Sequence, residues 1–103
     1  MTTETNDRVT IKLDTPIRRG ETIFEAIDLR RPLAGELRGT SIFAIARMET
    51  DALVTVLPRV TQPPLIEHEV LKLDAADLMQ CGLVLSGFCM PRALQALDAT
   101  PES

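Results

Sequence analysis

The chain changes its hydrophobic period only once, and this change limits the folds that it can adopt. Near the N-terminus Val9, Ile11 and Leu13 alternate with polar residues, which is the pattern of a strand with one buried face. Residues 22–29, with the sequence TIFEAIDL, form a second run rich in β-branched and aromatic residues. From residue 40 onward, apolar residues instead recur every three or four positions, as they do in helices. The order of the two patterns predicts an α+β fold, with an N-terminal two-stranded antiparallel hairpin followed by a small bundle of four to five short helices.

The two patterns meet in the stretch Leu29–Met48, which has the sequence LRRPLAGELRGTSIFAIARM. Pro32 has no N–H donor and biases Arg31 toward an extended conformation. Gly35 and Gly39 lie on either side of one short turn. We therefore interpret this stretch as a structural hinge that folds the hairpin onto the helical body.

Capping residues and a proline mark the helix boundaries. Thr50 can cap a helix in which Leu53 and Leu57 fall on one side. Pro58 should end or bend this helix near Leu57. Asp74 is a good N-cap for the last helix, and Asp77 in its first turn complements the helix dipole. The other expected helices are a short one over 32–38, one that begins after Thr40 or Ser41, and an amphipathic one over Leu65–Leu73.

A chain of 103 residues is long enough for one domain with a modest core, but not for two. We expect residues 1–7 to form a disordered tail and residues 92–103 to form a flexible C-terminal tail. Between them, residues 8–91 should fold as a single domain, made of the hairpin over 8–29 and the helical body over 32–91.

Charge and aromatic content make nucleic acid an unexpected partner. The chain has a net charge of −4, and three Phe residues are its only Phe, Trp or Tyr, whereas nucleic-acid binding requires that phosphates be neutralised. The first half nevertheless contains a basic set that could bind an acidic partner, although the solvated side of a hairpin is the favoured interpretation. This set consists of Arg18, Arg19, Arg30 and Arg31.

Cysteine usage and hydropathy favour the cytosol. Cys81 and Cys89 lie in one predicted helix, which separates them by about 12 Å and makes a disulfide between them impossible. Both lie among apolar residues, so buried reduced thiols are expected. The polar N-terminal sequence MTTETNDR shows no signal-peptide pattern, and the longest apolar run, 78–90, is too short to cross a bilayer. We therefore expect no membrane partner.

The sequence shows no pattern of catalytic or metal-binding residues. His68 is the only histidine, and its neighbours do not supply the helical spacing that a metal site needs. A CxxC motif is missing, and the pair Gly35 and Gly39 lacks the Lys and the Ser or Thr of a P-loop. A helix-turn-helix is excluded because its candidate reading helix, Asp51–Leu57, offers too few polar side chains for base edges and phosphates. The sequence thus predicts a protein that is not an enzyme and needs no cofactor or metal.

From Val9 to about Pro91, roughly four-fifths of the chain, the strand pair is followed by six short motifs in a fixed order. They are LRRPLAGELRG at Leu29–Gly39, ARM at Ala46–Met48, VLPRV at Val56–Val60, PPL at Pro63–Leu65, LDAADL at Leu73–Leu78 and GFCMP at Gly87–Pro91. In this order they resemble the tail assembly chaperone family of long-tailed bacteriophages and prophages, the Mu-like group. The chain departs from the family pattern at Ile66, where members tend to carry a Thr that caps the helix.

The resemblance implies a non-catalytic protein of the host bacterial cytoplasm that acts during tail morphogenesis and is absent from the mature virion. Its expected partner is the tape measure protein, a long helical protein that such chaperones keep soluble until the tail tube polymerises around it. Self-association and a longer, frameshifted product are further partners that the family suggests. The alternative is a small regulatory or adaptor module of a prophage that binds another folded protein. Structural tail genes beside this one would favour the chaperone.

Apolar residues of the last helix are the candidate partner-binding surface, with support from two residues of the helix after Thr50. A wide apolar stripe on a short helix indicates burial on more than one side. Gly82 and Ser86 would also let another helix approach closely, although plain internal packing is the favoured interpretation for them. An internal role remains open for each apolar candidate as well. The candidates are Leu78, Val84, Leu85 and Phe88, together with Leu53 and Leu57.

Overall fold

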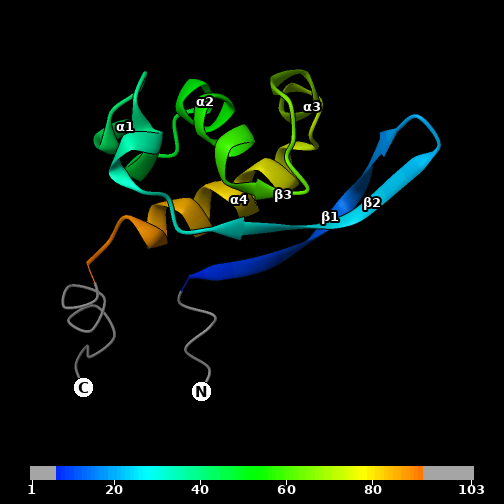
Figure 1. The fold of residues 1–103 in the computed structure, drawn as a ribbon, viewed down its shortest axis with the longest axis horizontal. Coiled ribbons are helices and arrows are strands. Elements are labelled where there is room, and N and C mark those ends of the chain that lie inside the picture. The colour runs from blue at the N-terminus through cyan, green and yellow to red at the C-terminus, as the bar shows by residue number, and fades with distance from the viewer. Residues whose placement is uncertain (1–6, 92–103) are drawn as a thin grey trace, which may run out of the picture.

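A computed structural model of the chain describes residues 7–91, and its fold is α+β, as predicted (Figure 1). The tails expected at either end lie outside the described residues, except for Asp7. The Asp7 carbonyl accepts a hydrogen bond from the Arg31 N–H at 2.8 Å. The elements are β1 (Arg8–Arg19), β2 (Thr22–Arg30), the 3₁₀ helix η2 (Ala34–Leu37), α1 (Ile42–Ala46), α2 (Thr50–Val60), β3 (Thr61–Gln62), α3 (Glu67–Leu71) and α4 (Ala75–Phe88).

Within residues 7–91 the sheet has three antiparallel strands in the order β1-β2-β3, so the prediction of two strands is wrong by one. The third strand consists only of Thr61 and Gln62, which pair with Leu29 and Asp28 of β2. Two residues are too few to show an alternating pattern, so hydrophobic periodicity cannot reveal this strand. β3 joins the end of α2 to the sheet and thereby fixes the helical body against the hairpin.

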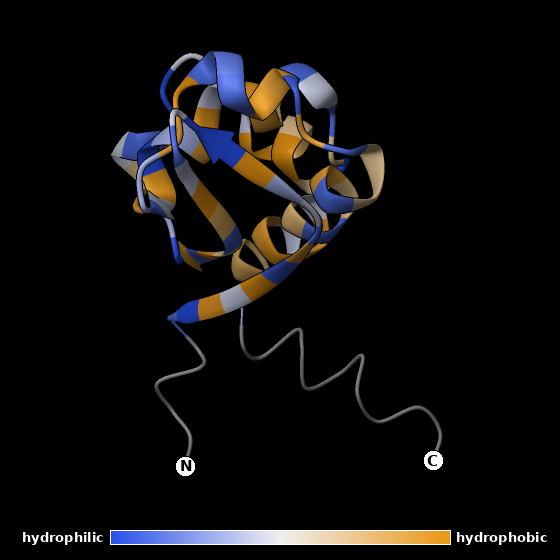
Figure 2. Ribbon diagram, turned by 90° about the vertical axis from the view of Figure 1, so that its right-hand side faces the viewer, coloured by the Kyte–Doolittle hydropathy of each residue, from blue (hydrophilic) through white to orange (hydrophobic). Residues whose placement is uncertain are grey.

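β1 contains a large irregularity where the sequence predicts a loop that begins at Asp14. Lys12 pairs with Ala26, but the next paired residue is Ile17, opposite Phe24. Four residues of β1 therefore lie opposite a single residue of β2, and such an insertion bends a strand. Figure 2 shows the regular alternation of hydrophobic and hydrophilic residues along the first part of β1, before this point.

Beyond the irregularity, the end of the hairpin projects past the helices (Figure 1). The alternation predicts that Ile23 faces the core together with Ile27 and Leu29. Ile27 and Leu29 are buried, but the Ile23 side chain is 51% exposed. The prediction for Ile23 is wrong because Phe24, the next residue of β2, packs against the core instead, and successive side chains of a strand point to opposite faces. Glu25, an unsuitable residue for a core face, is exposed for the same reason.

α2 passes through its proline. The sequence predicts an end or a bend near Leu57, but the helix continues through Pro58 to Val60. Pro58 cannot donate an N–H to the helix, but it is the third residue from the helix end, and the Thr61 N–H still reaches the Leu57 carbonyl. The Thr61 hydroxyl donates a second hydrogen bond to the same carbonyl at 2.9 Å.

α3 is shorter than the predicted span Leu65–Leu73. Ile66 cannot cap the helix with its side chain. Instead the Glu69 carboxylate accepts a hydrogen bond from the Ile66 N–H at 3.1 Å, which satisfies one of the donors at the helix start. The departure from the family pattern at Ile66 therefore leaves the helix with half of a capping box.

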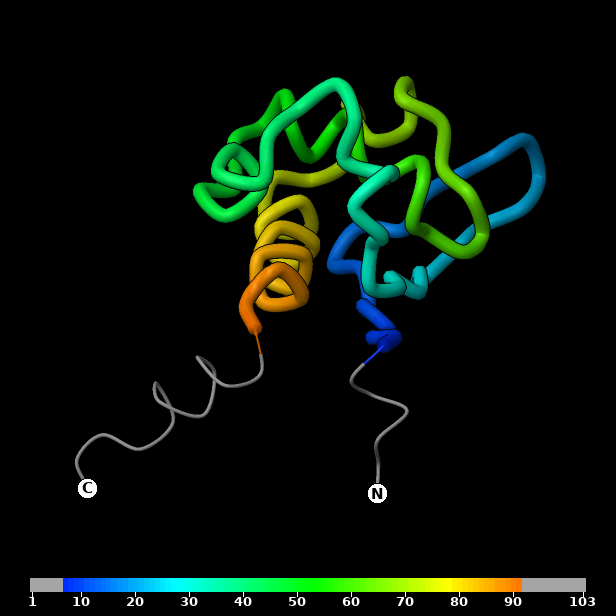
Figure 3. Tube along the Cα trace, turned by 60° about the vertical axis from the view of Figure 1, so that its left-hand side comes forward, coloured from blue at the N-terminus to red at the C-terminus, as the bar shows by residue number. Residues whose placement is uncertain are grey.

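α4 is the helix against which most other elements pack. It contacts β1 and β2 as well as α1 and α2, and Figure 3 shows it between the first two helices and the hairpin. A Cβ at Gly82 would lie 3.2 Å from Leu53 Cδ1 and 3.2 Å from Met48 Sδ, so Gly82 allows close internal packing. The largest fully buried side chains include Ile27, Leu29, Ile45, Leu57, Leu65 and Leu85.

Candidate functional site

The six predicted partner-binding residues lie mainly in the interior. Leu53, Leu57 and Leu85 are at most 2% exposed and belong to the core. Leu57 and Leu85 could contact a partner only if the helices separated, whereas Leu53 lines a hollow at the surface. Partner binding by the six residues stays a prediction. The other three, which are partly buried against the same core, are Leu78, Val84 and Phe88.

One side of α4 is apolar and exposed. Met79 and Leu83 are each more than half exposed, and Met90, just after the helix, is exposed as well. Together with Ser86 these residues are spaced i, i+4, i+7 and i+11, so they fall along one side of the helix. Large hydrophobic side chains usually lie in the interior, and a contiguous exposed set of them marks an interaction surface.

α1 places two exposed apolar side chains beside this line. The Ser41 hydroxyl accepts a hydrogen bond from the Ala44 N–H at 3.0 Å, which fixes the start of the helix. Ala44 and Ile45 are buried, so the helix turns Ile42 and Phe43 toward solvent, and Phe43 is 71% exposed. We call the combined surface the α1–α4 face, which consists of Ile42, Phe43, Met79, Leu83 and Met90.

Two hollows lie along the α1–α4 face. The Ser86 hydroxyl donates a hydrogen bond to the Ala46 carbonyl at 3.3 Å, so α1 and α4 touch beside them. The first has a volume of about 270 Å³ and is lined by Ile42, Phe43, Ala46, Ser86, Cys89 and Met90. The second has a volume of about 220 Å³ and is lined by Arg47, Met48, Thr50, Leu53, Ala75, Leu78 and Met79.

Three of the four methionines of the chain line these hollows. Methionine is flexible and polarisable, so a methionine-rich surface can adapt to different apolar partners. The hydropathy of the last helix does not single out Met79 and Met90, because it does not show which side of the helix the hairpin covers. Their spacing along the helix gives no signal of its own, because the buried residues Cys81 and Leu85 are four positions apart, as Met79 and Leu83 are.

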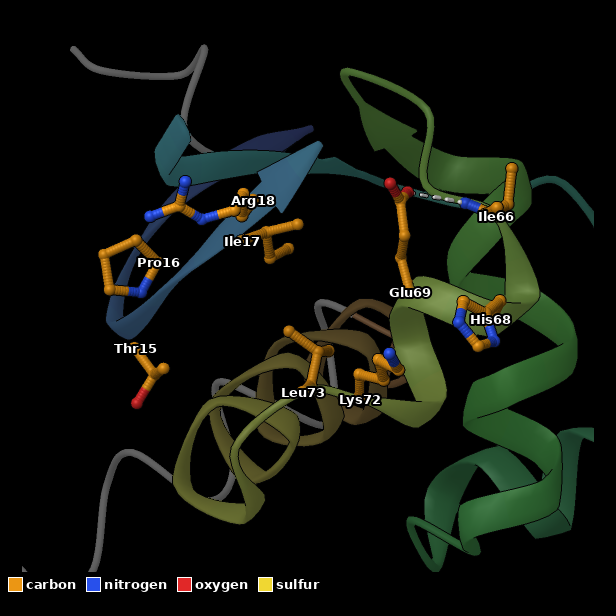
Figure 4. Close-up of a pocket in the computed structure, with 9 residues that line it drawn as sticks. All are labelled: Thr15, Pro16, Ile17, Arg18, Ile66, His68, Glu69, Lys72 and Leu73. Carbon is orange, nitrogen blue, oxygen red and sulfur yellow. Dashed lines mark hydrogen bonds between the residues drawn. The ribbon is translucent and has the colours of Figure 1, made fainter. Parts of the chain in front are cut away.

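A larger cavity, of about 470 Å³, lies between β1 and α3 (Figure 4), and we call it the β1–α3 pocket. Arg19 joins its two walls. The guanidinium donates to both carboxylate oxygens of Glu69, at 2.7 and 2.8 Å, and to the Pro64 carbonyl at 2.9 Å. These hydrogen bonds lower the pKa of Glu69 to about 2 and raise the pKa of Arg19. The pocket is lined by residues 15–18 of β1 and by Ile66, His68, Glu69, Lys72 and Leu73.

Asp77 of α4 fixes the irregular part of β1 that leads into this pocket. Its side chain is fully buried, and its two carboxylate oxygens accept hydrogen bonds from the Asp14 N–H at 2.7 Å and the Thr15 N–H at 3.0 Å. Gln80 Nε2 donates a third at 3.3 Å. The sequence places Asp77 correctly in the first turn of the last helix, but predicts only a dipole role for it. Because a buried carboxylate needs such donors, Asp77 determines the backbone path of the pocket wall.

Arg30 fixes the junction between the hairpin and the helices. Its guanidinium forms an ion pair with Glu36 and donates a hydrogen bond to the Arg59 carbonyl at 2.9 Å. The pairing lowers the pKa of Glu36 to about 2. Arg59 in turn donates to the carbonyls of Glu36 and Arg38, at 2.8 and 2.7 Å. Gly39 follows with a φ of +94°, a conformation that favours glycine, so the stretch forms a fixed junction.

Arg31 connects the junction to the end of α4. It donates a hydrogen bond to the Phe88 carbonyl at 2.8 Å, and its guanidinium carbon lies 5.1 Å from the centre of the Phe88 ring. This cation–π contact places a positive charge at the C-terminal end of a helix, where it is favourable. Of the four arginines in the basic set, only Arg18 has no ion-pair partner among residues 7–91.

The two thiols are poorly suited to nucleophilic chemistry. Burial raises the pKa of Cys81 to about 12 and also raises the pKa of Cys89, so both are protonated near neutral pH. Among residues 7–91, no three His, Cys, Asp or Glu side chains are grouped so that they could hold a metal ion. In the same part of the chain, no helix is long and apolar enough to cross a membrane.

Comparison with known proteins yields one family and two relatives. The model of the family described as "Phage tail assembly chaperone proteins, E, or 41 or 14" matches residues 10–89. Tail assembly protein E of Escherichia phage P2 is 44% identical over 90 residues, which cover 87% of this chain and 99% of that protein. Tail assembly protein E' of the same phage is 46% identical over 83 residues, 81% of this chain but only 58% of the longer relative. No solved structure matches the chain.

Proposed function

The chain belongs to the phage tail assembly chaperone family, and from that premise we propose that it binds the tape measure protein and keeps it soluble while the tail is assembled. In this proposal it acts by binding alone, without catalysis, in the cytoplasm of the bacterial host, and it does not remain in the finished virion. The family match extends over residues 10–89, so it includes both α1 and α4.

The observation that supports this proposal is the α1–α4 face. Ile42, Phe43, Met79, Leu83 and Met90 expose large apolar side chains along two helices that touch. Such a face is suited to an amphipathic helix, whose apolar side chains at positions i, i+3 or i+4 and i+7 enter a groove. The two hollows beside the face would receive the largest of these side chains. A helix of the tape measure protein, the client, no longer exposes its apolar side once it is bound in this way. The exposed side would otherwise cause the client to aggregate.

The longer relative suggests how the same surface could be used twice. The chain spans 58% of tail assembly protein E'. We propose that a longer product of this gene, made by frameshifting, carries the same α1–α4 face and joins the short form on the client. Self-association of the short form is a second way to cover a long client.

Co-expression with the tape measure protein from the same genome tests the proposal. The measured quantities are the fraction of client that stays soluble and its co-purification with the chain. Phe43→Asp and Leu83→Asp place a charge on the α1–α4 face at exposed positions, so the variants should fold. We expect both to lose client binding.

Leu71→Asp is the matched control, because Leu71 is 64% exposed on α3 and lies outside the α1–α4 face. This variant should bind the client as the original chain does. If Leu71→Asp abolishes binding as completely as Phe43→Asp, the α1–α4 face is not the client surface. If the unaltered chain leaves a well-expressed client insoluble, even together with the longer product, the proposed function is wrong.

A further inference from the structure

We propose that the β1–α3 pocket is a second docking site, which takes an acidic segment of a partner polypeptide with one large apolar side chain between carboxylates. This inference concerns a different surface from the α1–α4 face and does not rest on the proposed function. It uses Arg18, the one member of the basic set that the fold leaves without an ion-pair partner among residues 7–91.

The charge of the pocket is opposite to that of the chain. The chain as a whole carries −4, yet Arg18 and Lys72 both line the pocket, and neither has an ion-pair partner among the described residues. The one carboxylate in the lining belongs to Glu69, and Arg19 already satisfies both of its oxygens. The nearby Asp74 is engaged as well, because it accepts hydrogen bonds from the Thr15 hydroxyl and the Ala76 N–H. The cations of the pocket are therefore available to carboxylates from outside.

Apolar side chains of the pocket complement the two cations. Ile17 is buried and Leu73 is partly buried, and in Figure 4 they lie on the two facing walls of the pocket. Ile66, 59% exposed, adds an apolar side chain on the α3 side. A volume of about 470 Å³ is ample for one leucine-sized side chain and its neighbours. The pattern of apolar walls with cations on both sides matches an apolar residue flanked by Asp or Glu.

Both walls of the pocket are fixed before any ligand binds. Asp77 fixes the backbone at Asp14 and Thr15 on one wall. Arg19 connects the hairpin to Glu69 and Pro64 on the other. A preorganised pocket spends little binding free energy on ordering its own side chains, so a short segment can be recognised.

A defined peptide tests this inference on the full chain. The probe is a fluorescein-labelled, acetylated and amidated peptide in which one central leucine lies between two glutamates on each side. We expect it to bind in fluorescence anisotropy, and to bind more weakly as salt is raised, because exposed charges are screened. Replacing the glutamates by glutamine, or the leucine by alanine, should each weaken binding at least tenfold.

Protein variants locate the site. Arg18→Glu and Lys72→Glu change exposed residues and should each weaken peptide binding about tenfold or more, because like charges then face the peptide. Lys12→Glu is the matched control, since it makes the same charge change at an exposed position on β1 that does not line the pocket. Unchanged thermal melting of all three variants would show that folding is intact.

Several results would overturn the inference. They are no binding of the probe at about 1 mM, equal binding of the glutamine peptide, or an equal loss with Lys12→Glu. Displacement of the peptide by inorganic phosphate at similar concentrations would indicate a simple anion site, and preferred binding of a single-stranded oligonucleotide would indicate a nucleic-acid site. Neither result would alter the effect of Phe43→Asp on the tape measure protein, so the two proposals fail independently.

Discussion

Asp77 and Asp14, 63 positions apart in the sequence, are joined by a hydrogen bond of 2.7 Å from the Asp14 backbone N–H to the Asp77 carboxylate. The other carboxylate oxygen accepts the Thr15 N–H at 3.0 Å. One buried side chain of α4 therefore satisfies two backbone donors in the part of β1 that does not pair regularly with β2. The irregular strand and the helix depend on each other, because the N–H groups of Asp14 and Thr15 and the carboxylate of Asp77 satisfy one another's hydrogen bonds.

Replacing Asp77 should therefore destabilise the domain strongly. Asp77→Ala leaves two backbone donors without acceptors and should lower the free energy of unfolding by about 3 kcal/mol. Urea unfolding followed by circular dichroism measures this loss. Asp51→Ala removes an exposed acidic residue from the first turn of α2 and should cost less than about 1 kcal/mol. Equal losses in the two variants would contradict a special role for Asp77.

The two glycines of α4 should respond oppositely to a larger side chain. A Cβ at Gly82 would already lie 3.2 Å from Leu53 and Met48, so Gly82→Leu should destabilise the fold by about 2–3 kcal/mol through overpacking. At Gly87 a Cβ meets nothing within 4 Å. Gly87→Leu should be neutral or stabilise by up to about 1 kcal/mol, because leucine favours the helix more than glycine does. Thermal unfolding of the two variants compares them directly, and a stabilised Gly82→Leu would refute the packing argument.

The stability of the domain should fall in acid. The folded state lowers the pKa of both Glu36 and Glu69 from 4.5 to about 2, chiefly through their hydrogen bonds with Arg30 and Arg19. Carboxylates with a depressed folded-state pKa stabilise the fold above their unfolded pKa, and this contribution is lost as the pH falls from about 4.5 toward 2. The double variant Glu36→Gln, Glu69→Gln should therefore be less stable at pH 7 and show a smaller loss between pH 6 and pH 3. Urea unfolding across this range measures both, and an unchanged pH dependence would contradict the prediction.

The fold is predictable from the sequence in the segments where several local features follow one another closely. The alternation through Val9, Ile11 and Leu13 is visible within a few residues of sequence, and so is the effect of Pro32 and Gly39 at the junction. The hairpin and the start of the helical body are therefore predictable. β3 is not, because two residues carry no period. The path of β1 through Asp14 is not predictable either, since Asp14, Thr15 and Pro16 are typical of a loop and their acceptor lies on a helix far along the chain.

The partner-binding surface shows the same limit. The last helix is apolar nearly all round, so its sequence does not show which side the hairpin and α2 cover. Leu83 and Leu85 have the same hydropathy, but in the structure Leu85 is completely buried and Leu83 is 56% exposed. Only the packing of elements that are distant in sequence separates the core side of α4 from its exposed side.

Oxidation of methionine should impair the α1–α4 face. Met79 and Met90 are exposed there, and conversion to the sulfoxide makes a flexible apolar side chain polar. If this face binds the tape measure protein, brief treatment of the purified chain with hydrogen peroxide should weaken binding of a purified client segment about tenfold. Mass spectrometry identifies the oxidised residues, and light scattering of the client measures the remaining protection from aggregation.

The double variant Met79→Leu, Met90→Leu separates this effect from general damage. Leucine has nearly the volume of methionine and keeps the face apolar, so the untreated variant should bind the client almost as well as the original chain. After peroxide it should retain binding, because neither position can be oxidised. Cys89, whose pKa burial raises, should contribute little. If the treated double variant loses client binding as fully as the treated original chain, the methionines of the α1–α4 face are not part of the client surface.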